Sequence, residues 1–233
     1  MNDLLWVSSI PLAYLLYRGT KVTYNDVIAY YRNKELENLS NEKFTEKVKI
    51  IGVGGGGSAI VEYLSNKYPN RYDSIILNSD KKALTSKNVT NKIHLEKSDD
   101  FGCGSNTLCG YNLINDSVIE KLKSFINTDK KVFIFATLGG GCGTGSVKAL
   151  SQYLPMKDLD IQYLLTTPFT WEGLKRTNRA NETIEFLKNN NAKTTIFSND
   201  DLLKFGNMSI KDCFNKQDEE FHKIIGLLFL EKS

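Results

Sequence analysis

The sequence predicts an α/β protein with a doubly wound, mainly parallel sheet, helices on both faces and a long helix of the central type at the end. Three observations predict it. From Val48 onward, short apolar and β-branched runs alternate with stretches of helical periodicity, as in strand–helix–strand units. Two of these runs lead into glycine-rich loops that open onto helices. The last segment keeps a helical spacing of apolar residues nearly to its end.

The composition is that of an ordinary globular protein with one domain, or one domain and a small appendage. The chain has 233 residues, of which 41% are hydrophobic and 24% are charged. The net charge of +3 is too small to indicate nucleic acid binding, and no run of Lys or Arg exceeds two residues. We find no signal peptide and no apolar stretch of the ~20 residues that a membrane span requires. A soluble cytoplasmic protein without a transmembrane segment is therefore expected.

The four cysteines are Cys103, Cys109, Cys142 and Cys213. They lack C-x-x-C spacing, and the two histidines of the chain are the nitrogen ligands that could join them. The sequence thus indicates neither a zinc site nor a disulfide framework. We expect reduced thiols, as is usual in cytosolic proteins.

Residues 1–46 do not share the pattern of the rest, and we assign them to an N-terminal extension. Leu4–Tyr17 is apolar without a clean period, and Thr23–Leu39 is predicted to be a helix capped by Thr23 or Asn25. The segment is either a packed extension, which we favour, or a small docking element.

Residues 47–233 form the second predicted unit, in which strands and helices alternate. The predicted strands are Val48–Ile51, Ser74–Leu77, Lys92–Leu95, Val132–Leu138, Ile161–Thr167 and Thr194–Ser198. The predicted helices are the one that carries Ile60, Val61 and Leu64, then Asp116–Phe125, Val147–Leu154 and Asn181–Lys188. A capping box at Ser209–Asp212 starts the last helix, about two dozen residues long. In such sheets ligands bind at the carboxyl ends of the strands, where both glycine loops are expected.

The two glycine loops, Gly52–Ser58 and Gly139–Ser146, favour an anion, and phosphate is the first candidate. The first loop matches the G-x-G-x-x-G dinucleotide pattern, but a dinucleotide fold has no use for the second loop. The second loop has glycines at P-loop spacing, but Ser146 stands where the phosphate-binding lysine belongs. What remains is a mononucleotide whose phosphates are held from two sides by backbone N–H groups.

Both loops resemble those of the tubulin/FtsZ family, whose bacterial members carry G-x-G-G-G-G-x-N after the first strand and G-G-G-T-G-T/S-G after the fourth. Other segments follow in the family's order. Residues 78–80 are similar to its N-T-D motif and residues 102–106 to its G-A-G-A-N loop. Residues 168–176 resemble P-F-x-F-E-G-x-x-R, and residues 199–203 resemble N-D-x-L-L.

The resemblance implies a GTP- or GDP-binding domain, with Mg²⁺ accompanying the nucleotide. The residues it places at the α- and β-phosphates and along the phosphate chain are Gly54, Gly55, Gly56, Gly57, Ser58, Gly139, Gly140, Gly141, Cys142, Gly143, Thr144 and Gly145. Asp80 belongs to the same implied site, and those implied to sense the γ-phosphate are Gly104, Ser105 and Asn106.

The sugar and the base are assigned in the same way. Glu172 would accept hydrogen bonds from the ribose hydroxyls, with Arg176 one helical turn away beside the sugar and phosphates. Phe214 would stack on the base, and Asp218 would accept from the guanine N1–H and the exocyclic amine. Adenine offers no matching pair of donors.

Two residues depart from the family pattern. Ala59 stands in place of an asparagine that contacts the guanine, so reduced affinity or base selectivity is expected. Cys142 replaces a threonine of the second loop, which removes a hydroxyl and keeps the backbone N–H groups. Its thiol is either a redox-sensitive group beside the phosphates or, as we favour, a buried inert cysteine.

In the family, the long helix leads to a loop whose acids position the attacking water on the GTP of the next subunit, and then to a second domain. This sequence stops at Ser233, before that loop, so no catalytic residue is assigned. We expect a GTPase that needs a complementary loop, linked to cell division or filament assembly. The alternatives are a non-hydrolysing cap or regulator of an FtsZ-type filament, and a fragment whose remainder was removed. An unpartnered apolar face near Phe221–Leu230 is expected to cause self-association or docking of the N-terminal extension.

Overall fold

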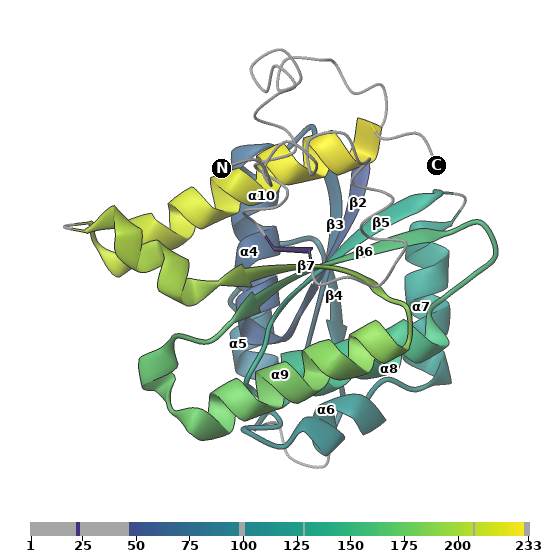
Figure 1. Ribbon diagram of the computed structural model, residues 1–233. Helices are drawn as coiled ribbons and strands as arrows, with labels where there is room; N and C mark the ends of the chain where they lie inside the picture. Colours follow the sequence, from purple (N-terminus) through teal and green to yellow (C-terminus); the bar gives the residue numbers. More distant parts are fainter. Residues whose placement is uncertain (1–21, 24–46, 98–100, 128, 207, 231–233) are drawn as a thin grey trace, which may run out of the picture.

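The computed structural model describes residues 22–23, 47–97, 101–127, 129–206 and 208–230 (Figure 1). The strands are β1 (Val22–Thr23), β2 (Val48–Val53), β3 (Tyr72–Asn78), β4 (Asn91–His94), β5 (Lys131–Thr137), β6 (Asp160–Thr167) and β7 (Lys193–Ser198). They form one sheet in the order β1-β7-β6-β5-β2-β3-β4, and every pairing is parallel. The predicted doubly wound parallel sheet is confirmed.

Helices connect the strands. The α-helices are α4 (Gly54–Lys67), α5 (Lys81–Thr85), α6 (Thr107–Asn112), α7 (Asp116–Ile126), α8 (Cys142–Tyr153), α9 (Leu174–Asn189) and α10 (Ile210–Leu230). Two 3-10 segments, η2 (Thr170–Glu172) and η3 (Asn199–Phe205), follow β6 and β7. None of the described helices is both long and apolar enough to cross a membrane.

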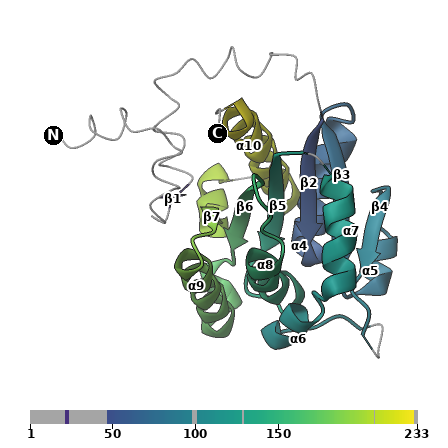
Figure 2. The ribbon, with the colours of Figure 1, turned by 90° about the vertical axis from the view of Figure 1, so that its right-hand side faces the viewer.

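The helices cover both faces of the sheet (Figure 2). α7, α8 and α9 pack on one face, and α4, α5 and α10 pack on the other. In β5, Val132 and Ile134 belong to the first core cluster, whereas Phe133 and Phe135 belong to the second. A strand buried on both sides has no solvent-facing positions, which explains its continuous apolar run.

The long helix α10 closes the second face of the sheet. Phe221 contacts the rings of Phe135 and Phe197 edge-on, at centroid distances of 5.4 and 4.4 Å. The other apolar residues that α10 buries are Ile224, Ile225, Leu227 and Leu228. The expectation of an unpartnered apolar face near Phe221–Leu230 was therefore wrong, because the sheet itself is the packing partner. The start of α10 follows the prediction, since the Asp212 amide donates to the Ser209 hydroxyl.

Most glycines of the predicted loops lie within the first turn of a helix, since α4 begins at Gly54 and α8 at Cys142. Glycine is a poor helix former, but close packing requires it here. A β-carbon at Gly57 would collide with the Phe135 carbonyl oxygen, and one at Gly145 would collide with the Thr107 carbonyl oxygen. The glycines therefore let both helices begin directly at the sheet.

The N-terminal segment is described only at β1, where Val22 and Thr23 lie opposite Thr195 and Ile196 of β7. Thr23, one of the two predicted helix caps, is thus part of a strand. The rest of that predicted helix and the apolar segment 4–17 lie outside the described residues. The division into units 1–46 and 47–233 stays a prediction.

The packing of α8 against α6 generates a stability test. Gly145→Ala is expected to destabilise the protein by about 2–4 kcal/mol, because the new methyl group meets backbone atoms of Thr107 and Tyr111 that cannot move aside cheaply. Gly140→Ala is the matched control, since no heavy atom lies within 4 Å of its added β-carbon. This control is expected to change the free energy of unfolding by no more than about 0.5 kcal/mol. Urea denaturation of both variants measures the difference, and equal midpoints would contradict the packing argument.

Candidate functional site

The site lies where the sheet order reverses. β2 pairs with β3 on one side and with β5 on the other, so the crossover connections diverge between β2 and β5. The carboxyl end of β2 runs directly into α4, and β5 leads through Gly139–Gly141 into α8. Ligands of doubly wound sheets bind at such a switch point.

The starts of α4 and α8 touch each other. Gly54 has φ of +72°, and a β-carbon there would lie 2.7 Å from the Gly143 nitrogen. Neither helix has a side-chain cap or an acidic residue in its first turn. By contrast α5, α6 and α7 are capped by the side chains of Asp80, Asn106 and Asn115. Two adjacent uncapped helix starts present backbone N–H groups and positive dipole ends, which favour an anion.

Glycines on three segments leave open space beside these helix starts. Nothing lies within 4 Å of a β-carbon placed on Gly55, Gly104 or Gly140. Others of the predicted phosphate residues are tightly packed, since a β-carbon at Gly56 would strike the Thr137 side chain and one at Gly141 would lie 2.7 Å from the Asn106 carbonyl oxygen. Some of these glycines therefore border open space, and others are required by close packing.

The predicted phosphate residues that have side chains differ in burial and in hydrogen bonding. The Thr144 hydroxyl is buried and accepts a hydrogen bond from the Gly139 amide at 2.9 Å, which fixes the turn before α8. Ser58 is buried within α4, and its hydroxyl has no partner among the described residues. Cys142 is a half-buried free thiol at the start of α8. Asp80 caps α5 through the Ala83 amide at 2.8 Å.

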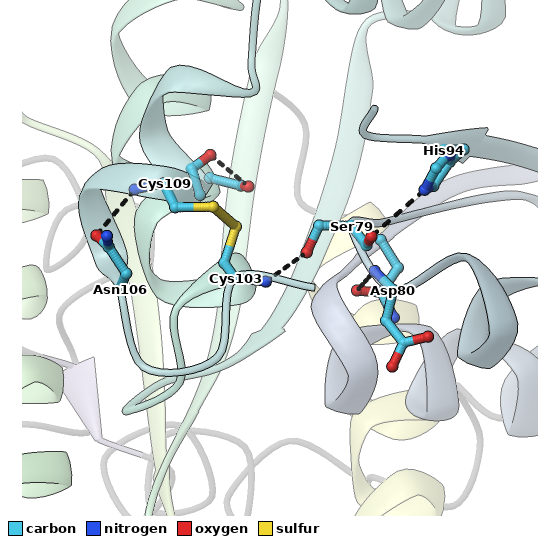
Figure 3. The surroundings of a disulfide bond; sticks show 9 residues. Ser79, Asp80, His94, Cys103, Asn106 and Cys109 are labelled. Carbon is cyan, nitrogen blue, oxygen red and sulfur yellow. Dashed lines mark hydrogen bonds between the residues drawn. A yellow bond between two sulfur atoms is a disulfide. The ribbon is translucent and has the colours of Figure 1, made fainter. Parts of the chain in front are cut away.

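The segment 103–106 lies on the second glycine loop. The Gly104 carbonyl accepts from the Gly141 amide at 2.7 Å, and the Asn106 side chain accepts from the Cys109 amide at 3.1 Å. At its start, the Cys103 amide donates to the Ser79 hydroxyl at 3.1 Å (Figure 3). Gly104, Ser105 and Asn106 are all exposed.

A disulfide closes this segment, so the expectation of four reduced thiols was wrong. Cys103 and Cys109 are bonded, with Cα atoms 5.6 Å apart (Figure 3), whereas Cys142 and Cys213 are free. The pairing depends on a turn with Gly104 at φ of +53° and on the start of α6, which the cysteine spacing does not reveal.

A cavity of about 400 Å³ extends from Gly56, at the start of α4, toward α10. It is lined by α4, the ends of β5, β6 and β7, η2, α9 and α10. Five of the predicted site residues line it together, namely Gly56, Glu172, Arg176, Phe214 and Asp218. They come from segments more than thirty residues apart in sequence, and the fold brings them to one place.

Glu172 and Arg176, which both line this cavity, form an ion pair. The carboxylate accepts from the Phe169 amide at 2.8 Å and from Arg176 Nη1 at 2.6 Å. Arg176 also lies close to Gly139, so this pair connects the cavity to the second glycine loop. Arg179, which the sequence did not single out, donates from Nε to the Gly139 carbonyl at 2.8 Å and so positions the loop.

The far end of the cavity is aromatic and acidic. Phe214 is 37% exposed and lies edge-on to Phe169, whose ring stacks on Trp171. Asp218, one turn further along α10, is only 7% exposed and accepts no hydrogen bond from a described residue. Burial raises the pKa of the Asp218 carboxyl from 3.8 to about 7.

Two further acceptors in the cavity lack partners. Asn199 Oδ1 and Thr166 Oγ1 are buried without a hydrogen bond from any described residue. Buried polar atoms are normally paired, so unpaired ones beside a cavity point to a ligand that supplies N–H or O–H donors. Asn199 belongs to the N-D-x-L-L-like segment, which was the signal that could have identified it as a site residue.

The family follows from comparison with known proteins. Residues 47–207 match the GTPase domain of the Tubulin/FtsZ family. This chain belongs to the tubulin/FtsZ family. It is 32% identical over 181 residues to the cell division protein FtsZ of Mycoplasmopsis pulmonis, covering 77% of this chain and 46% of that protein. It is 30% identical to FtsZ of Aquifex aeolicus, covering 77% and 50%.

Solved structures of the tubulin/FtsZ family share the fold. An empty FtsZ dimer from M. jannaschii aligns with a TM-score of 0.69 at 27% identity, over 86% of this chain and 60% of that one. A GTPγS-bound protofilament of CetZ2 from Haloferax volcanii aligns with a TM-score of 0.68 at 21% identity, over 78% and 58%. The chain spans about half the length of the FtsZ proteins it matches.

In this member of the tubulin/FtsZ family, the cavity shares lining residues with a neighbouring hollow. Ala59 on α4 lines the cavity described above and also a second, outer hollow of about 860 Å³ between α4 and α10. The two hollows share Ala59, Phe214 and Asp218. The small side chain at this position leaves them adjoining.

The buried Asp218 carboxyl is expected to make the free energy of unfolding depend on pH. Folded Asp218 keeps its proton up to about pH 7, whereas the unfolded chain loses it near pH 3.8, so stability is lost as the pH rises between these values. Asp218→Asn is expected to remove this penalty and to stabilise the protein by on the order of 3 kcal/mol at pH 8.

The gain should stay nearly constant from pH 8 to about pH 7 and shrink as the pH falls from 7 toward 3.8, below which both states of the natural chain are mostly protonated. Urea denaturation at several pH values measures it. Glu220→Gln is the control on the same helix, because Glu220 forms a partly exposed ion pair with Lys223. A constant gain across the pH range would contradict the assigned burial effect.

Proposed function

We propose that this chain is a guanine-nucleotide-binding domain that holds GTP and GDP between the glycine loops and α10. The observation that carries the proposal is the buried, unpaired Asp218 at one end of a cavity whose other end adjoins two uncapped helix starts. A ligand that carries hydrogen-bond donors at one end and several negative charges at the other would fit both Asp218 and the helix starts.

Each part of the nucleotide has matching residues. The phosphates would lie against the N–H groups of α4 and α8, in the space beside Gly55, Gly104 and Gly140. The ribose hydroxyls would donate hydrogen bonds to the Glu172 carboxylate, which is also paired with Arg176. The base would stack on Phe214 and present its donors to Asp218.

Guanine satisfies the base end better than adenine does. Its N1–H and exocyclic amine give two neighbouring donors to a carboxylate, and Asn199 Oδ1 is a further acceptor in the same cavity. Above about pH 7 Asp218 is ionised, and adenine N1, which is an acceptor, would then face a carboxylate with no proton between them. Guanine donors would also favour the ionised form of Asp218, so binding releases a proton below about pH 7.

Hydrolysis would need a residue from a second polypeptide. The acidic residues that line the cavity are Glu172 and Asp218, which the proposal uses at the sugar and the base. The described residues include no cluster of three or more metal-binding side chains, so Mg²⁺ would be held by phosphate oxygens and water. This chain would bind and orient GTP, while the helix starts stabilise charge on the departing phosphate.

We propose a role in cell division or filament assembly in the cytoplasm. Large apolar side chains are exposed on segments that follow the carboxyl ends of the strands, namely Phe101, Leu108, Trp171, Leu174, Leu203, Phe205, Ile210 and Phe214. Exposed apolar side chains gathered around a site favour a protein partner. An FtsZ-type subunit or a second copy, covering the nucleotide, is the proposed occupant, in line with the dimer and protofilament of similar proteins.

The first test measures nucleotide affinity by calorimetry. The natural chain is expected to bind GTP and GDP at least about 100-fold more tightly than ATP, because an unpaired buried acceptor costs about 1–3 kcal/mol. Asp218→Asn should lose most of this preference, whereas Glu220→Gln should keep it. Equal binding of ATP and GTP by the natural chain would contradict guanine recognition.

Phosphate release tests the hydrolysis proposal. GTP turnover should be absent with this chain alone and should appear when an intact FtsZ is added as a source of the complementary loop. Turnover by the chain alone would contradict both this proposal and the non-hydrolysing cap. Binding without turnover in either mixture would instead favour the cap or regulator.

A gain in nucleotide affinity is expected from a substitution at Ala59, beside the proposed position of the base. Ala59→Asn should increase GTP and GDP affinity about 5-fold, the equivalent of one added hydrogen bond of about 1 kcal/mol. Ala59→Leu fills similar volume without a hydrogen-bonding group and is the matched control. An equal gain in affinity in both variants would show that the effect comes from packing and would contradict the added hydrogen bond.

A further inference from the structure

The Cys103–Cys109 disulfide encloses the residues that the family resemblance assigns to the γ-phosphate. Gly104, Ser105 and Asn106 lie between the two bonded cysteines, and the bond ties the start of this turn to the first turn of α6. We propose that these two cysteines are a reversible redox site that controls recognition of the γ-phosphate. This inference rests on the proposed binding of GTP.

The enclosed segment is in direct contact with the second glycine loop. The Gly104 carbonyl accepts from the Gly141 amide at 2.7 Å, and there is no room for a β-carbon at Gly141 because Asn106 backbone atoms lie against it. A conformational change in the 103–109 segment would therefore also shift Gly141, directly before the start of α8.

The helix that carries Cys109 is equally close to α8. A β-carbon at Gly110 would collide with the Gly141 carbonyl oxygen, and the Ser146 hydroxyl donates to the Gly110 carbonyl at 2.9 Å. The disulfide thus joins two segments, the 103–106 turn and α6, that each pack on the phosphate-binding loop. Opening the bond would let them move separately.

The two sulfurs differ in access. Cys103 is buried, whereas Cys109 is half-buried and follows the exposed Leu108. A thiolate of a dithiol reductant of the thioredoxin class would attack Cys109 Sγ, and Cys103 would leave as a thiolate and take up a proton. The second thiol of the reductant then attacks the mixed disulfide and releases Cys109 as a thiol. Two electrons pass to the protein, and the reductant becomes a disulfide.

The reverse reaction with a disulfide oxidant restores the bond. Disulfides in cytosolic proteins are usually transient and redox-sensing, so a bond at this place in a proposed cytoplasmic protein suits a regulatory role. Cys142 and Cys213 are not needed for this exchange.

The redox state would act on GTP more than on GDP. With the bond formed, the turn that carries Gly104 is held in one shape, and the γ-phosphate finds its backbone in place. With the bond open, GTP must order the turn on binding, and that lost entropy weakens affinity. GDP lacks the γ-phosphate and gains nothing from the ordered turn.

The test compares the full chain after air oxidation and after treatment with dithiothreitol. Alkylation followed by mass measurement should label two cysteines in the oxidised protein and four in the reduced protein. Reduction should weaken GTP binding about 5-fold and leave GDP binding within about 2-fold. The Cys103→Ser/Cys109→Ser double variant should match the reduced protein under both conditions, and because it keeps the other two cysteines it also reports any effect of theirs.

Four labelled cysteines in the oxidised protein, or the same ratio of GTP to GDP affinity in both states, would overturn the redox site. Failure to bind any nucleotide in either state would contradict the proposed function instead. The redox site is then judged by hydrogen exchange at residues 101–112. Faster exchange after reduction would support it, and equal exchange would overturn it.

Discussion

The close contact between the starts of α4 and α8 is the constraint on which the rest of the structure depends. Gly54 and Gly143 meet with no room for a β-carbon, and the two helices begin directly at the ends of β2 and β5. This contact places two uncapped helix starts at one point of the sheet. Substituting larger residues would separate the helices and disrupt the proposed anion site. The glycines therefore act as packing residues first, and by doing so they shape the proposed binding surface.

The opposite end of the cavity is built at a cost in stability. Asp218 is held in a nearly buried position by α10, the same helix that fills the core with Phe221. A neutral or apolar residue would suit the empty cavity better, since burial raises the pKa of the carboxyl to about 7. Such a misfit is expected where selection acts on a bound state, and it distinguishes Asp218 from the paired surface acids such as Glu220.

The sequence predicted the features that depend on local pattern. Strands such as β5 have continuous apolar runs because both faces are covered, and glycines between a strand and a helix indicated where α4 and α8 begin, beside the proposed anion site. It missed what depends on distant segments. The Cys103–Cys109 bond requires a turn that α6 and Gly141 shape, and α10 buries its apolar face on the sheet, which helical periodicity alone cannot show. Asn199 was visible as a motif residue, but its unpaired oxygen appeared only once the cavity formed.

The two ends of the proposed nucleotide site differ in how they are held. Phe214 and Asp218 lie on a helix of 21 residues that is anchored in the core, so the base end is rigid. The γ-phosphate end consists of a turn, exposed at Gly104, Ser105 and Asn106, and the 6-residue helix α6, which packs closely on α8. An exposed turn has low local stability, so the bond that ties it to α6 has a large effect there. A site built this way would recognise guanine in every state, while its response to the third phosphate depends on the Cys103–Cys109 bond.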